Sequence, residues 1–305
     1  MPIDSRLSVS ISSPKSEHLS DSQRHFMAKL TELVQAKGLR VLPDSATTDD
    51  LATRLSMIRQ CQGVVVLGFA QWRGEGVPPV QRKSIVMPSE FSHVAAAMAV
   101  AEGRPLLVLR QKSVTERGTF RSGYLPHVVR APDSLSVDWL AGEEFRLEFD
   151  KWTSAVMKFK HVFLGYSSQA SRTAEKIHSF LADTLKLRVY DWRDFRAGDS
   201  IWDSIVRAER NTSCGLFLFM ADDKLSGDLK GKFAPRDNVV YEAGYFAGAK
   251  GRERSLVIRE SGAKVPSDLG GILYLELTER SNIAPIEGRL RTRLAEMLGG
   301  RPDDD

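Results

Sequence analysis

The strongest pattern in this chain is the segment Arg236-Asp237-Asn238-Val239-Val240-Tyr241-Glu242-Ala243-Gly244-Tyr245-Phe246. It begins with polar residues that favour a helix start, and its apolar residues then recur at helical spacing, at Val239, Ala243, Phe246 and Ala247. Glu242 lies off this apolar face, within about the first turn, beside Gly244 and Gly248. Such glycines let another backbone or a flat ligand come close. A carboxylate placed there is either a helix-dipole partner or a catalytic group.

Strands flank this helix on both sides in the sequence. A continuous apolar run at 215–220 precedes it, and a second run at 255–258 follows it. The rest of the second half also alternates, with expected strands at 161–165 and 187–190 and expected helices at 174–185 and 201–210. Strands that alternate with helices favour a parallel, doubly wound sheet with right-handed crossovers.

The first half follows the same plan. Strands are expected at 7–12, 39–42, 63–69 and 106–109, and helices at 26–33, 51–58 and 91–101, with a Gly/Pro-rich loop at 72–79. We therefore expect an α/β protein with two flavodoxin/Rossmann-like domains, at 1–140 and 161–300. Residues 141–160 are interpreted as a connector, and the sequence does not decide whether it is a helix or a strand. Phe145, Phe149 and Trp152 fit one helical face, but 145–149 also alternates like a strand.

A constant offset relates the two halves. Gly63 and Gly215 are 152 positions apart, as are Glu90 and Glu242, and Leu106 and Ile258 keep the same spacing. The offset favours a duplication or two related folds in tandem. The alternative is a shared architecture without common ancestry.

Composition excludes several classes of protein. With 42% apolar and 27% charged residues the chain is not disordered, and a net charge of +4 with interleaved acidic residues is no nucleic-acid signature. The start lacks the order of a signal peptide and no apolar run could span a bilayer, so we expect a cytoplasmic protein. The two cysteines, Cys61 and Cys214, are expected to be buried thiols. No histidine spacing resembles a metal site, so no metal is expected.

The carboxyl ends of parallel strands mark the expected binding crevice. The loops there contain groups that suit a nucleotide, because hydroxyls and backbone N–H groups bind phosphate, an indole can stack on a base and arginines pair with pyrophosphate. The candidate binding residues are Tyr166, Ser167, Ser168, Trp192, Arg193, Asp222, Arg236 and Asn238. Alternatives stay open, since the serines could cap a helix, Trp192 could be core, and Asp222 with Asp223 could form a turn.

Five segments in order resemble a known family: HVFLGYSSQ, RVYDWRDF, SCGLFLFMADD, RDNVVYEAGYFAGAKGRER and VPSDLGGILYLEL. Residues of about 160–280 are similar to the TIR-like (Toll/interleukin-1 receptor-like) nucleotide-binding domain of bacterial anti-phage effectors. Within that group they resemble the TIR domain of TIR–STING effectors of cyclic-oligonucleotide signalling. In such domains the glutamate of the RDNVVYEAGYF block is the catalytic residue of NAD+ cleavage, which implies that Glu242 is catalytic here.

The resemblance implies an NAD+ nucleosidase that uses NAD+ as a substrate and needs no further cofactor. Nicotinamide leaves as a neutral molecule, so the enzyme must chiefly stabilise a cationic, oxocarbenium-like ribosyl transition state. Glu242 would hydrogen-bond the ribose and supply negative charge. Two alternatives stay open, namely a non-catalytic TIR adaptor or nucleotide-binding scaffold, and a synthase of a cyclic ADP-ribose signal.

The first domain is expected to sense a signal or drive assembly into a homo-oligomer. Its segment MPSEFSHVAAAMAVAEGRPLLVL distantly resembles TIR or deoxyribosyltransferase-like domains, in which Glu90 would match the helix glutamate. It lacks the Arg-Asp-Asn lead-in, which favours sensing over a second active site. The basic residues Arg73, Arg82, Lys83, Arg104 and Arg110 could receive a cyclic nucleotide or another small anionic signal, or could form a solvated basic face.

Overall fold

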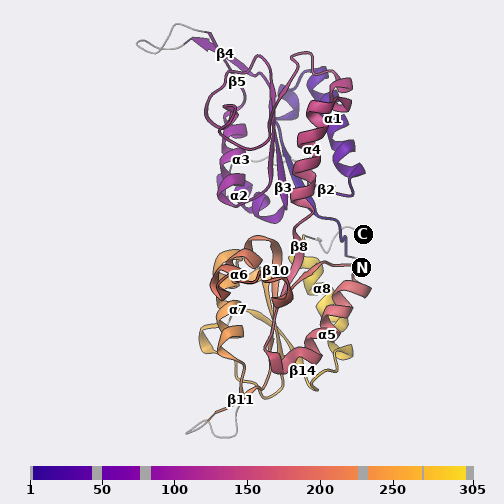
Figure 1. The fold of residues 1–305 in the computed structure, drawn as a ribbon, viewed down its shortest axis with the longest axis vertical. Coiled ribbons are helices and arrows are strands. Elements are labelled where there is room, and N and C mark those ends of the chain that lie inside the picture. The colour runs from indigo at the N-terminus through magenta and orange to yellow at the C-terminus, as the bar shows by residue number, and fades with distance from the viewer. Residues whose placement is uncertain (1–2, 43–49, 76–83, 226–232, 270, 300–305) are drawn as a thin grey trace. The chain divides into compact units, whose positions relative to one another are not determined.

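The computed structural model describes residues 3–42, 50–75, 84–225, 233–269 and 271–299. The chain forms two compact units, one made of Arg6–Phe159 and the other of Met1–Ser5 with Lys160–Asp305. Each unit is an α/β fold around a parallel sheet, which confirms the expected fold class (Figure 1).

The sheet of the first unit has the order β2-β1-β3-β6-β7, and all its pairings are parallel. Its central strands read as continuous apolar runs because helices cover both faces. The strands are β1 (Ser8–Ser12), β2 (Arg40–Val41), β3 (Gly63–Gly68), β6 (Leu106–Gln111) and β7 (Val128–Ala131).

Helices cover both faces of this sheet. One face packs on α1 (Asp21–Ala36) and α4 (Glu143–Val156), and the other on α2 (Leu51–Gln60) and α3 (Glu90–Ala101). Ser20 begins α1 with a capping box, since its hydroxyl accepts from the Gln23 backbone while Gln23 accepts from Ser20. An antiparallel hairpin, β4 (Trp72–Glu75) with β5 (Ser84–Met87), follows β3, so the start of the expected 72–79 loop is a strand. The remainder of that loop lies outside the described residues.

The segment 141–160, interpreted above as a connector, holds α4, which belongs to the core of the first unit, while Lys160 already begins β8 of the second unit. Phe145, Phe149 and Trp152 share a buried helical face, and Trp152 Nε1 donates to the Pro105 carbonyl at 3.1 Å. The helical alternative holds because four apolar residues, these three and Val156, recur at intervals that only a helix brings to one side.

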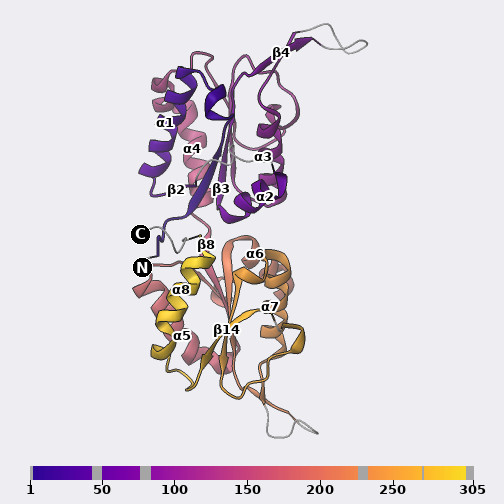
Figure 2. The same cartoon turned by 180° about the vertical axis from the view of Figure 1, so that it is seen from behind.

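The second unit has the same sheet order when read from the other edge, β9-β8-β10-β13-β14, again with parallel pairing throughout. Helices α6 (Ile201–Arg210) and α7 (Asp237–Lys250) cover one face, and α5 (Ser171–Ser179) and α8 (Glu287–Met297) cover the other (Figures 1 and 2). The strands are β8 (Lys160–Gly165), β9 (Val189–Tyr190), β10 (Thr212–Phe219), β13 (Ser255–Glu260) and β14 (Leu273–Leu277).

Several elements of the second unit differ from expectation. The helix expected at 174–185 is α5 followed by a π-helical turn at Phe180–Thr184. Edge strand β14 and helix α8 were not expected, nor was the short hairpin of β11 (Asp223–Lys224) and β12 (Phe233–Ala234). Short or edge elements leave weak periodicity, and the missed strand β7 of the first unit is of the same kind.

The shared topology supports related folds, but the 152-residue offset does not hold throughout. Val64 pairs with Leu106, and Leu216 pairs with Leu256, so placing Gly63 on Gly215 brings Leu106 onto Leu256 and not onto Ile258. Glu90 is the first residue of α3, whereas Glu242 is the sixth residue of α7. The sixth residue of α3 is the buried Ala95. Glu90 and Glu242 therefore do not occupy equivalent helix positions, although they are 152 residues apart in the sequence.

Gly63 and Gly215 both allow bulky side chains to close over a central strand. A Cβ on Gly63 would lie 2.4 Å from Val156 Cγ2, and one on Gly215 would lie 2.6 Å from the Phe217 ring and 2.8 Å from the Phe246 ring. Cys61 and Cys214, which precede them, are buried free thiols, as expected. The glycines thus make room for core side chains.

We expect Gly215→Ala to destabilise the protein by about 1–3 kcal/mol, because the two packed rings must move. Gly248→Ala is the matched control, since its Cβ position on helix α7 has no atom within 4 Å besides the adjoining residues and backbone of its own helix. That change should stabilise the protein by about 0.5–1 kcal/mol through helix propensity. Urea unfolding measures both changes. Equal stability of the two variants would contradict the packing role of Gly215.

Candidate active site

The carboxyl ends of β8 and β10 form the topological switch point of the second sheet. From β8 the chain crosses to β9 on one side and then returns to β10 on the other. Loops diverge at such a point and leave a crevice, so ligands of open α/β sheets bind there. Helix α7 follows β10, and its second turn carries Glu242.

Glu242 lies against the last residue of β8. A Cβ on Gly165 would be 2.6 Å from Glu242 Oε2 and 2.7 Å from the Phe217 ring. Only glycine at 165 therefore lets the carboxylate approach the strand end so closely. The apolar face of α7 holds it there, because Val239, Ala243 and Phe246 are buried against the sheet as predicted.

One oxygen of the Glu242 carboxylate is buried without a partner, although the residue as a whole is only half-buried. Its Oε2 atom is inaccessible and has no hydrogen-bond partner among the described residues. Burial raises the pKa of Glu242 from 4.5 to about 7. A helix-dipole role does not explain this placement, because the dipole acts mainly within the first turn and Glu242 is the sixth helical residue. An unsatisfied buried acceptor costs free energy, which a ligand that donates a hydrogen bond would recover.

Asn238 is one helical turn before Glu242 on the same side of α7, since positions i and i+4 are neighbours. It is exposed, as is Arg236 at the helix start. Arg236 forms no side-chain cap, contrary to the polar start expected from the sequence, and pairs instead with Asp223 at 3.1 Å. This side of the helix thus leads from an exposed amide to a buried carboxylate.

Ser167 and Asp222 are structural partners. The buried Ser167 hydroxyl donates to Asp222 Oδ2, and Arg280 donates to Asp222 Oδ1 at 3.0 Å. Arg280 also binds Glu260 at 2.7 Å, and Glu260 accepts from the Ala221 backbone at 2.8 Å. This network ties together the loops after β8, β10 and β14 beside Gly165. Asp222 is therefore more than the turn residue that the sequence left as an alternative. Ser168, in contrast, is exposed, and its carbonyl accepts a hydrogen bond from the Ser171 hydroxyl.

Sequence reasoning missed Arg280 and Glu260. Arg280 is 58 residues from Asp222, and no local pattern joins them. Glu260 ends β13 and Arg280 follows β14 by three residues. Recognition of β14 as a strand would have placed Arg280 at the edge where the other strand ends meet.

Trp192 and Tyr166 lie together. Trp192 Nε1 donates to the Tyr166 hydroxyl at 2.6 Å, and Trp192 remains 59% exposed, so it is not a core residue. Arg193 is not free to bind a ligand, because Nε donates to both oxygens of the buried Asp191 at 3.0 Å. The hydrogen bonds to Asp191 raise the pKa of Arg193 further above its ordinary value. The indole is thus available for stacking, whereas the guanidinium is engaged.

The first unit does not repeat this arrangement. Glu90 is exposed at the start of α3. Arg104 donates to the Arg59 carbonyl at 3.0 Å, and the buried Arg110 donates to Val114 and Glu116. Both side chains hold the fold and are not open to an anionic signal. Arg73 is exposed on β4, and Arg82 and Lys83 lie outside the described residues.

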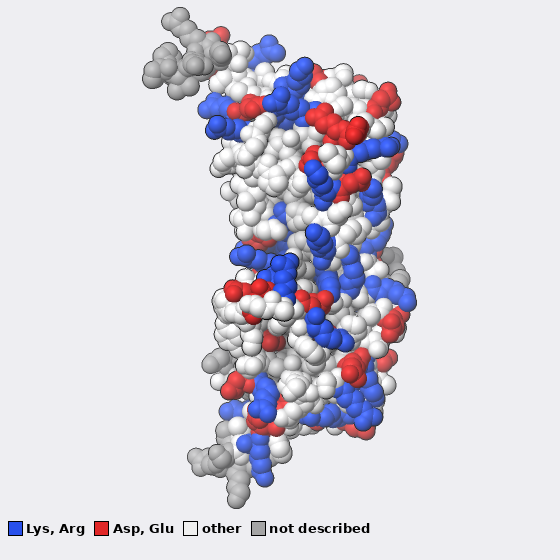
Figure 3. Space-filling model, in the orientation of Figure 1, with Lys and Arg blue, Asp and Glu red and all other residues white. Residues whose placement is uncertain are grey.

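The face of the molecule drawn in Figure 3 does not carry charge of a single sign. Lys and Arg side chains interleave with Asp and Glu on the face shown in Figure 3, as the net charge of +4 suggests. Within the described ranges, no cluster of three or more His, Cys, Asp and Glu side chains is suited to a metal ion. Nor does any described helix combine the length and apolar character needed to cross a membrane.

Comparisons with known proteins identify the second unit. Residues 161–279 match the family model described as the TIR domain of the CAP12/Pycsar effector protein. CD-NTase-associated protein 12 from a Lachnospiraceae bacterium is 35% identical over 113 residues, 36% of this chain and 35% of its own length. Pycsar effector protein PaPycTIR from Pseudomonas aeruginosa is 30% identical over 142 residues, 43% of this chain and 46% of its own. The similarity therefore covers less than half of these relatives.

Among solved structures, the TIR domain of the Toll-related receptor TRR-2 from Hydra magnipapillata aligns with 45% of this chain and 98% of its own. The TM-score is 0.30 and the identity 15%, so this alignment carries no weight in the assignment. The family model confirms the resemblance stated from the sequence motifs. Residues 161–279 of this chain form a TIR domain of the CAP12/Pycsar effector family.

Proposed function

We propose that the chain is an NAD+ nucleosidase that acts as an effector of bacterial anti-phage defence. The observation that carries the proposal is the buried, unpaired carboxylate oxygen Oε2 of Glu242 against Gly165, at the switch point of a TIR domain. The motif around Glu242 is the one in which the family resemblance places the catalytic glutamate.

The reaction breaks the bond between C1′ of the ribose and the nicotinamide nitrogen. The electron pair leaves with nicotinamide, which departs neutral and needs no acid. Water then adds its oxygen to C1′ and loses a proton to solvent, which yields ADP-ribose. Positive charge develops on the ribose in between, so a fixed negative group beside the ring stabilises the transition state.

Glu242 suits that role. Its Oε2 lacks a donor in the described residues, and a ribose hydroxyl would supply one. Burial strengthens the attraction between the carboxylate and the ribosyl cation, because the local dielectric is low. The positive nicotinamide ring of bound NAD+ would also lower the pKa of Glu242 and favour its ionised form. Substrate binding thus prepares the charge that the reaction needs.

Asn238 and Trp192 are the remaining groups that suit NAD+. Asn238 precedes Glu242 on the same side of α7 and is exposed, so its amide can hydrogen-bond the substrate. Trp192 is exposed, and its indole can stack on a base. Arg193, Ser167 and Asp222 act by holding the loops in place.

We further propose that activity depends on a signal. Relatives of the TIR domain are named Pycsar effectors, and the first unit offers a separate α/β fold for a regulatory ligand or for assembly into a homo-oligomer. A cyclic nucleotide is the proposed signal. Product analysis separates hydrolysis from synthesis of a cyclic ADP-ribose, and absence of turnover under every signal would favour the adaptor.

The first test is removal of the carboxylate. Glu242→Gln should lower nicotinamide release from NAD+ by about 100–1,000-fold, the usual loss for a group that stabilises transition-state charge. Release is measured with the purified full chain, with and without a panel of cyclic nucleotides. Glu90→Gln is the matched control and should retain wild-type release, because Glu90 is exposed in the other unit. Undiminished release by Glu242→Gln would refute the site.

The second test is the pH dependence of the rate. Since the free enzyme must ionise Glu242, kcat/KM should rise about tenfold per pH unit below a pKa of about 7 and level off above it. Initial rates of nicotinamide release between pH 5 and 9 measure this profile. A rate that falls as the pH rises through 7 would instead mean that the protonated carboxyl is required.

The third test is the pH dependence of stability. The folded-state pKa of Glu242 is raised from 4.5 to about 7, so its contribution to stability is present below pH 4.5 and is lost as pH rises through 7. Glu242→Gln should therefore be more stable than wild type at pH 8, by up to roughly 3 kcal/mol, and nearly equal to it at pH 4. Urea unfolding at the two pH values measures the difference. A stability difference between Glu242→Gln and wild type that does not change with pH would contradict burial of the charge.

A further inference from the structure

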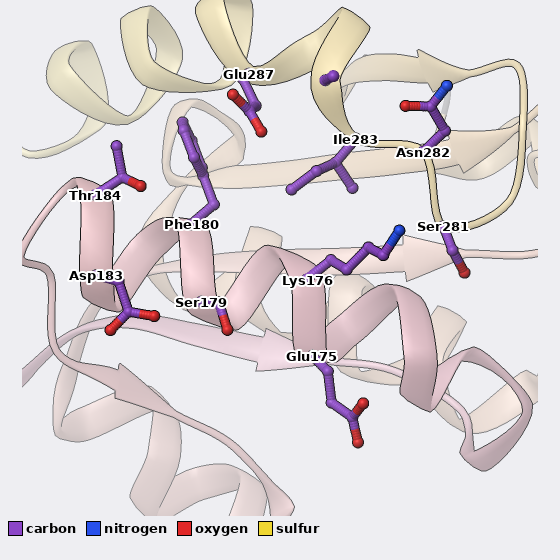
Figure 4. A pocket seen from close by; sticks show the side chains of 11 residues that line it. Glu175, Lys176, Ser179, Phe180, Asp183, Thr184, Ser281, Asn282, Ile283 and Glu287 are labelled. Carbon is purple, nitrogen blue, oxygen red and sulfur yellow. The ribbon is translucent and has the colours of Figure 1, made fainter.

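Two cavities adjoin helix α5 on the face of the second sheet opposite to α7. One, of about 600 Å³, is lined by Gln169, Arg172, Thr173, Lys176, Glu279, Arg280, Ser281 and Asn282. The other, of about 560 Å³, lies between Phe180 and Ile283 (Figure 4). Both are lined by Lys176, Ser281 and Asn282, so they form one continuous groove, which we call the α5 groove.

One end of the α5 groove carries unneutralised positive charge. Arg172 and Lys176 are exposed, and neither has an ion-pair partner among the described residues. They are four positions apart on α5, an arrangement in which like charges repel and weaken the helix. Figure 4 shows Lys176 extending toward the loop with Ser281 and Asn282, while Glu175 points away. A bound anion would relieve the repulsion.

Neutral donors face the same end. The hydroxyls of Thr173 and Ser281 are 3.2 Å apart, and Thr173 is only 1% exposed. Ser281 has φ of 68°, a conformation that is strained for a serine and holds its side chain at the groove. Asn282 also lines this end, but its Nδ2 donates to the Glu279 carboxylate at 3.1 Å, so this amide is engaged. Arg280 contributes less charge, because Asp222 and Glu260 neutralise it.

The other end of the groove is of different character. The side chains of Phe180 and Ile283 line it, and its charged lining residues besides Lys176 are the acids Glu175, Asp183 and Glu287. Figure 4 shows Glu287 on α8 facing Phe180 across the cavity. These acids would repel an extended polyanion, so the ligand must confine its negative charge to the end with Arg172 and Lys176, where Glu279 is the one acid among the lining residues.

We propose that the α5 groove binds a small phosphate ester. The phosphate lies on Arg172 and Lys176 with a donor from Ser281, and a neutral or cationic organic group lies against Phe180 and Ile283 near Glu287. Charged donors and hydroxyls around an oxyanion form strong, short hydrogen bonds. This site is separate from Glu242 and goes beyond the proposed cleavage of NAD+.

The test is isothermal titration calorimetry of the full chain at constant ionic strength, with inorganic phosphate and phosphocholine as probes. Phosphocholine combines a phosphate ester with a cationic end and should bind more tightly than inorganic phosphate. Arg172→Gln and Lys176→Gln should each weaken phosphocholine binding about tenfold, as expected for loss of one charged donor.

Matched controls remove the same charges elsewhere. Arg289→Gln and Lys264→Gln change exposed residues that line neither cavity and should leave the affinity unchanged. Glu242→Gln should also bind phosphocholine normally, which separates this site from the substrate site. Absence of binding by wild type, or equal weakening in the controls, would overturn the proposal. Equal affinity for the two probes would refute the role of the Phe180 end.

Discussion

The close approach of the Glu242 carboxylate to Gly165 is the constraint on which the TIR unit depends. A carboxyl oxygen lies only 2.6 Å from where a Cβ at position 165 would be, without a hydrogen-bond partner in the described residues. Folding tolerates this cost because Val239, Ala243 and Phe246 anchor α7 on the sheet over its whole apolar face. Burial of the apolar side of α7 thus offsets the cost of holding the unsatisfied Glu242 carboxylate in position on another side of the helix.

Around this carboxylate, polar groups divide into those that hold the loops and those that remain open. Asp222, Arg280 and Glu260 satisfy one another and connect the loops after three strands. Within a single loop, Asp191 accepts two hydrogen bonds from Arg193. Asn238 and Trp192 remain exposed. A preorganised site needs both kinds of group, because a fixed charge is useful only when its surroundings do not relax toward it.

The two units show how one topology serves different chemistry. Both sheets have the same strand order, and both place a glycine under packed side chains in the third strand, at Gly63 and Gly215. In the first unit, the helix position that corresponds to Glu242 by count is the buried Ala95, and its arginines stabilise loops. The fold is therefore common to both units, while a buried carboxylate oxygen without a partner belongs to the second alone among the described residues.

The sequence by itself determined the alternation of strands and helices, the buried face of α7 and the family of residues 161–279, because these depend on local periodicity and on a contiguous motif. It also singled out Glu242. Only the tertiary structure decided that α4 belongs to the first unit, that Arg193 is engaged by Asp191, and that Arg280 joins Asp222 to Glu260. Each of these depends on contacts between residues whose partners have no periodic or motif relation to them. The burial that raises the pKa of Glu242 is likewise a property of the packed sheet and helix, since no pattern within α7 specifies what lies above its carboxylate.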